Sequence, residues 1–144
     1  MTNSGFKYFI DPPHTSMFAR IFGVLSFPIA KEMAITARTD TSYENHFHTL
    51  TELSGVKFEL TSEELRQIAI FINTNWPTDG KIHACMILDS ELAHGLVRMY
   101  DTFVEGRADS PQIFRTDTPN LKNKVIEYME LPSDHQFPDF LSFA

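Results

Sequence analysis

The sequence predicts an α/β protein in which about four helices flank a mixed β-sheet. Short apolar or β-branched runs alternate with amphipathic segments along the 144 residues, an order typical of βαβ units. The chain also opens with a hairpin signal, because the turn Asp11–His14 separates the extended runs 6–10 and 17–25. The length and the 42% hydrophobic content suit one domain with its own core.

The first half of the chain carries clear helix-start signals. Ser26 is placed to cap a helix over 27–39, where a proline in the first turn is tolerated. Residues 46–56 form an extended run that closes at Gly55. Thr61 and Glu64 have the spacing of a capping box. A second helix is expected after them, and its apolar face consists of Leu65, Ile68, Ala69 and Ile72.

The second half continues the alternation. The segment Trp76–Gly80 breaks the second helix, and the apolar run 82–88 is typical of a central strand that is buried on both faces. A third helix is expected after a cap at Asp89 or Ser90, with an apolar stripe from Leu92 to Phe103 and an end at Gly106. A short edge strand should follow around Ile113, and Thr118–Pro119 should cap and start the last helix, which carries Leu121, Val125, Ile126 and Met129.

The C-terminal segment departs from this pattern. We expect residues 1–131 to form the single domain, and residues 132–144 to form an aromatic tail. The tail is too apolar to remain free, since it contains Phe137, Phe140, Leu141 and Phe143. It should therefore dock on its own domain or on a partner subunit, and the second case would favour a homodimer.

Composition excludes several classes of protein. Twelve Lys and Arg against nineteen Asp and Glu give a net charge of −7, and the basic residues are scattered, which argues against nucleic-acid binding. The longest apolar stretch, 22–30, is too short to span a membrane. A single cysteine, Cys85, forbids an intramolecular disulfide. Because no signal peptide is visible at the N-terminus, we expect a cytoplasmic protein.

Two adjoining segments carry a family resemblance. The segment KIHACMILDSELAHGLVRMYDTFVEG, followed by QIFRTDTPNLKNKVIEYM, resembles a group of small bacterial proteins of unknown function with a G-L-x-R-M-Y signature. The matching residues are Gly95, Leu96, Arg98, Met99, Tyr100, Phe114 and Arg115. These proteins resemble STAS-type and SpoIIAA-like domains, whose fold is related to CRAL-TRIO lipid-binding domains. Over about 6–131, the resemblance implies a mixed sheet with helices on its faces and no catalytic machinery.

A second resemblance concerns Thr61. The segment TELSGVKFELTSEEL is similar to the phosphorylated segment of anti-sigma-factor antagonists, with Leu53–Val56 and Phe58 matching. Thr61 stands where the family has its phosphorylatable serine, so the resemblance implies a candidate phospho-acceptor. However, Leu60 replaces the aspartate and Glu63 the glycine. The ordinary helix-cap role therefore remains the alternative for Thr61.

No complete catalytic or metal-binding constellation is visible. The glycines fit neither a dinucleotide nor a P-loop pattern, so we expect no cofactor. His46 and His48 project to one side of a strand, but no third ligand is defined, so we expect no metal site. The other candidate histidines are His14, His83, His94 and His135. Cys85 lies in the middle of an apolar strand, so we expect it to be a core residue rather than a nucleophile.

The best candidate binding residues follow the buried strand. Asp89 and Ser90 lie at its carboxyl end, where open α/β sheets bind ligands, and Arg98 and Tyr100 extend this candidate site. Helix capping and core packing are the structural alternatives for these residues. We expect a non-catalytic regulatory or protein-interaction module, and as an alternative a protein that binds a small apolar ligand or lipid.

Overall fold

The computed structural model confirms the α/β fold with a mixed sheet. It describes residues 4–77, 82–91, 93–95, 98 and 112–144. Five strands form the main sheet in the order β1-β2-β4-β6-β7. Their bounds are β1 Gly5–Asp11, β2 Ser16–Phe22, β4 His48–Glu52, β6 Ala84–Leu88 and β7 Gln112–Arg115. The pair β1–β2 is the predicted antiparallel hairpin, and the other neighbouring strands are parallel.

A second sheet of two short strands was not predicted. β3 Val24–Ser26 pairs in parallel with β5 Lys57–Glu59. The extended run 17–25 is therefore two strands and not one. Gly23 separates them with a φ of +76°, a conformation that only glycine adopts freely.

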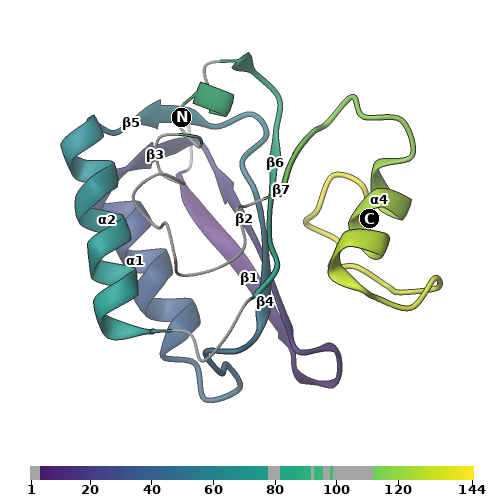
Figure 1. The fold of residues 1–144 in the computed structure, drawn as a ribbon. Helices are drawn as coiled ribbons and strands as arrows, with labels where there is room; N and C mark the ends of the chain where they lie inside the picture. Colours follow the sequence, from purple (N-terminus) through teal and green to yellow (C-terminus); the bar gives the residue numbers. More distant parts are fainter. Residues whose placement is uncertain (1–3, 78–81, 92, 96–97, 99–111) are drawn as a thin grey trace.

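Two helices cover one face of the main sheet (Figure 1). α1 spans Phe27–Arg38 and α2 spans Ser62–Asn75. Both predicted caps are confirmed, since the Ser26 side chain accepts a hydrogen bond from the Ile29 N–H, and Thr61 and Glu64 form a complete capping box. Local chemistry thus fixes where both helices begin.

The opposite face carries α4, Leu121–Met129, and the C-terminal tail (Figure 1). The predicted start of this helix at Thr118–Pro119 is wrong. The Thr118 hydroxyl instead accepts a hydrogen bond from the Arg115 N–H, which closes the turn after β7. The helix begins after Asn120, whose φ of +56° is left-handed.

The tail packs on its own domain. Phe137 and Leu141 are buried in one apolar cluster with Phe18, Leu50 and residues of α4. Beside this cluster, the fully buried carboxylate of Glu52 accepts hydrogen bonds from the Ser54 hydroxyl and from the Ser142 N–H, the latter at 2.8 Å. The tail is therefore held by both apolar and polar contacts to the sheet.

Two further expectations concern the third helix and the absence of a membrane-spanning segment. Most of the predicted helix over 92–103, including Tyr100, lies outside the described residues. In the described part of the chain, no helix has the length and apolar character needed to cross a membrane.

Candidate functional site

Small side chains gather on the sheet face that α1 and α2 cover. Side chains alternate between the two faces of a strand. The helix-covered face carries Thr49 and Thr51 on β4 and Ala84 on β6, whereas the opposite face of β4 carries the larger Leu50. These short side chains lie in the wall of a cavity beneath the two helices.

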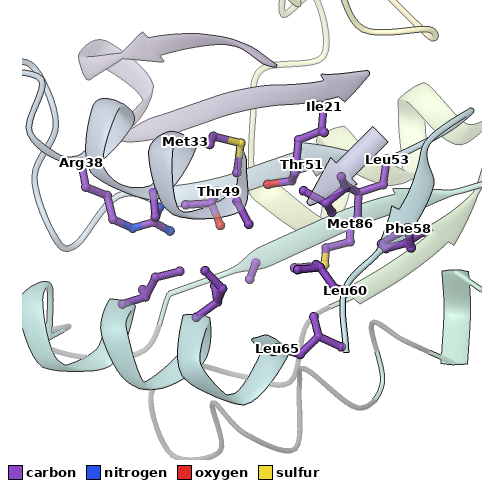
Figure 2. A pocket seen from close by; sticks show the side chains of 16 residues that line it. Ile21, Met33, Arg38, Thr49, Thr51, Leu53, Phe58, Leu60, Leu65 and Met86 are labelled. Carbon is purple, nitrogen blue, oxygen red and sulfur yellow. The ribbon is translucent and has the colours of Figure 1, made fainter. Parts of the chain in front are cut away.

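The cavity has a volume of about 140 Å³ and lies between the sheet and the two helices. Its wall is mainly aliphatic (Figure 2). β2, β3, β4 and β6 contribute Ile21, Leu25, Thr49, Thr51, Ala84 and Met86, and Leu53 follows directly after β4. The helices and the chain around β5 contribute Ala30, Met33, Ala34, Arg38, Phe58, Leu60, Leu65, Ile68 and Ile72.

Arg38 is the only charged residue among the described residues that line the cavity. It is the last residue of α1, and Figure 2 shows it at one end of the cavity, with Phe58 and Leu60 at the other. Its guanidinium carbon lies 6.0 Å from the ring centroids of both Tyr43 and Trp76. These rings hold the cation in place without neutralising it.

The guanidinium of Arg38 also lacks polar partners. Its Nε is buried and makes no hydrogen bond, and nothing in the described part of the chain forms an ion pair with it. The buried hydroxyl of Tyr43 is likewise without a hydrogen-bond partner. Leaving a buried donor unpaired costs about 1–3 kcal/mol, and more for a charged group. One end of the cavity therefore carries an unpaired buried donor, Arg38 Nε, and a positive charge.

The predicted residues at the carboxyl end of β6 have structural partners. Asp89 Oδ2 accepts a hydrogen bond of 2.7 Å from the Gly55 N–H, and Ser90 Oγ accepts one of 3.1 Å from the Ala93 N–H. These contacts tie the turn after β4 to β6 and cap the helical residues that follow. Arg98 is exposed, and Tyr100 lies outside the described residues, so the four residues stay a predicted binding site.

Thr61 and Cys85 occupy ordinary structural positions. The Thr61 hydroxyl accepts a hydrogen bond from the Glu64 N–H at 3.1 Å, which is the cap role, and its phosphorylation stays a prediction. Cys85 is 1% exposed, and burial raises the pKa of its thiol to about 12. The thiolate that a cysteine nucleophile requires is therefore absent at neutral pH.

Four of the six histidines form two pairs. His48 Nδ1 accepts a hydrogen bond of 2.9 Å from the His83 N–H, and burial and the neighbouring His83 lower the pKa of His48. His14 and His135 lie together near Asp11, with ring centroids 4.8 Å apart. His46 and His48, which the sequence places on one strand, do not form a ligand set with a third residue among the described residues.

Sequence reasoning did not find the cavity. One usable signal was the alternation on two strands, because Thr49, Thr51 and Ala84 place short side chains on a single face. No comparable signal pointed to Arg38, which ends an amphipathic helix in the manner of any C-terminal cation.

Comparison with known proteins adds no relative. No family model, no curated protein and no solved structure matches the chain significantly. The resemblance to STAS-type and SpoIIAA-like domains therefore stays a prediction.

Proposed function

We propose that the protein binds a small apolar carboxylate in the cavity beneath α1 and α2. The observation that carries this proposal is the unpaired guanidinium of Arg38 at one end of a mainly aliphatic cavity. This proposal gives a specific form to the alternative function predicted from the sequence, which was the binding of a small apolar ligand or lipid. Ligand sites in proteins are commonly apolar pockets with a few polar groups that fix the orientation of the ligand.

The volume of the cavity limits the size of the ligand. An apolar cavity of about 150 Å³ accommodates a molecule of the size of benzene, and this one measures about 140 Å³. The ligand is therefore a monocyclic aromatic acid or a short acyl chain rather than a long-chain lipid. Met33 and Met86 are flexible side chains in the wall and allow modest variation in ligand shape.

The charge of the ligand follows from Arg38. A carboxylate accepts two parallel hydrogen bonds from a guanidinium, and such charge-assisted bonds are among the strongest in proteins. Arg38 has no such partner in the described structure, so a ligand carboxylate would satisfy it. The apolar remainder of the ligand would point towards Phe58 and Leu60 at the far end (Figure 2).

Calorimetric titration with hexanoate, benzoate and the neutral analogue hexan-1-ol tests the proposal. We expect saturable 1:1 binding of at least one acid, with a Kd between about 1 µM and 1 mM for so small a ligand. Arg38→Gln should weaken acid binding about 10–150-fold, since a hydrogen bond to a charged group contributes about 1.5–3 kcal/mol. Binding of hexan-1-ol should be much less affected by this change.

A matched control lies on the same helix. Lys31 is an exposed cation of α1 that does not line the cavity, so Lys31→Gln makes the same change of charge away from the site. It should leave the Kd of the acid unchanged. The proposal fails if none of the acids binds at millimolar concentration, or if Arg38→Gln weakens the alcohol and the acid equally.

The regulatory or protein-interaction role and the homodimer remain predictions. Phe137 and Leu141, which were candidates for a dimer contact, are instead buried against the chain's own sheet. A homodimer would therefore have to use another surface. The large apolar side chains that are exposed among the described residues are Phe9, Ile35 and Ile70.

A further inference from the structure

A second cluster of polar side chains lies on the opposite face of the sheet from the cavity. Asp11 ends β1, His14 follows it in the tight turn of the hairpin, and His135 comes from the C-terminal tail. One ligand atom from each residue lies within 4.8 Å of the other two. The fold thus brings together two imidazoles and a carboxylate, although one imidazole is more than 120 residues away in the sequence.

The distances within the cluster suit a shared metal ion. His14 Nδ1 lies 2.8 Å and His135 Nε2 lies 3.8 Å from Asp11 Oδ2. In a tetrahedral zinc site, bonds of about 2.0–2.1 Å place neighbouring ligand atoms about 3.3 Å apart. The three atoms lie within 4.8 Å of one another, so a side-chain adjustment that closes the widest separation by up to about 1.5 Å would bring them around one ion.

The burial of the cluster points in the same direction. The side chain of His135 is only 3% exposed, and its Nε2 is buried without a hydrogen-bond partner. The side chain of Asp11 is 13% exposed, whereas that of His14 is 35% exposed. An orphaned buried nitrogen thus faces a nearly buried carboxylate, and the half-exposed His14 leaves a path from solvent.

The hairpin turn preorganises two of the three ligands. Pro12 and Pro13 stand between Asp11 and His14, and their rings fix φ within the turn. The Ser16 hydroxyl also donates a hydrogen bond of 2.9 Å to the His14 carbonyl. Asp11 and His14 therefore keep their relative positions without a metal, which lowers the entropic cost of binding one.

We propose that Asp11, His14 and His135 bind a divalent first-row transition metal ion, for which Zn²⁺ is the probe, and that the ion fastens the tail to the hairpin. Imidazole and carboxylate are the ligands that Zn²⁺ and its neighbours prefer when no thiolate is present. Three protein ligands leave a fourth position for water. The sequence predicted no metal site because the pair His46 and His48 lacked a third ligand, whereas the proposed site uses other residues that only the tertiary fold brings together.

Zn²⁺ titration of the metal-free full chain tests the site. We expect one Zn²⁺ per chain by calorimetry, and a rise in Tm of about 8 °C at a free Zn²⁺ concentration one hundred times the Kd. His14→Gln and His135→Gln should each weaken binding at least about 100-fold, since even the loss of an outer hydrogen-bond partner of a metal ligand costs about 10–100-fold. His14 is the safer variant because it is half-exposed.

A control variant at another histidine and a proteolysis measurement complete the test of the metal site. His46 is an exposed histidine outside the cluster, so His46→Gln should bind Zn²⁺ as the unmodified chain does. Zn²⁺ should also slow digestion of the tail by carboxypeptidase in the unmodified chain and not in His14→Gln. The proposal is overturned if the unmodified chain binds no Zn²⁺ stoichiometrically, or if folded His14→Gln retains the same affinity and the same shift in Tm.

Discussion

Filling the cavity should stabilise the protein, and Thr51→Ile is the most direct way to do so. Thr51 lies on β4 with its side chain in the wall of the cavity. Its hydroxyl makes no hydrogen bond within the described part of the chain, so the substitution breaks none there. Isoleucine is β-branched like threonine and suits a strand equally well.

The magnitude follows from the added apolar atoms. Isoleucine replaces the hydroxyl with a methylene and adds a methyl group, and each buried CH₂ contributes about 0.8 kcal/mol. Immobilising the longer side chain costs about 0.5–1 kcal/mol. The free energy of unfolding should therefore rise by about 1 kcal/mol, which raises Tm by roughly 3–4 °C for a chain of this size.

Urea denaturation of Thr51→Ile against Ala19→Val measures the effect. Ala19 is the register partner of Thr51 on β2, is fully buried and does not line the cavity. Valine at that position should overpack the core and destabilise it by about 1–3 kcal/mol. Thr51→Ile should also weaken hexanoate binding. If Thr51→Ile destabilises the fold as much as Ala19→Val does, the cavity does not exist in solution.

Three further predictions concern the polar contacts of the fold. Glu52→Ala should lower the free energy of unfolding by about 1.5–3 kcal/mol, because it removes the buried carboxylate that accepts hydrogen bonds from Ser54 and Ser142, and limited proteolysis should find the tail more accessible. Thr61→Ala should cost about 1 kcal/mol through loss of the cap, whereas Thr61→Ser should cost little, as thermal denaturation would show. The folded-state pKa of His48 is lowered by burial, by His83 and by His46, against an opposing effect of Glu130. As pH falls, the unfolded chain therefore takes up a proton at His48 before the folded chain does, so the free energy of unfolding should decrease below about pH 6.5. His48→Gln should flatten this part of the curve of stability against pH. An unchanged curve would contradict His48 as the origin of the pH dependence.

Local signals in the sequence predicted what local chemistry controls. Ser26 and the pair Thr61 and Glu64 predicted where two helices begin, because a cap depends only on residues three positions apart. The start of α4 was missed for a related reason. Thr118 has the composition of a cap, but its hydroxyl closes the turn after β7, and a left-handed Asn120 precedes the helix instead.

The sequence alone could not predict which distant segments of the chain contact each other. The strands β3 and β5 are only three residues long, so neither carries a periodic signal. The contact between His135 and Asp11 depends on where the tail docks, and hydrophobicity alone predicted docking without a position. The cavity depends on which short side chains share a face and on how closely two helices approach it, which only the folded chain fixes.

The two faces of the sheet differ in a way that separates the two proposed sites. On the tail side, the larger Phe18, Leu50 and Ile87 fill the space up to α4 and the tail, and Asp11 points to that side with them. On the helix side, the smaller Thr49 and Thr51 leave the cavity that Arg38 closes. Because a packed sheet lies between them, Zn²⁺ acts on the tail and an acid acts on the helices with little energetic coupling. Independent binding of the two probes is therefore what this architecture implies, and failure of one site carries no consequence for the other.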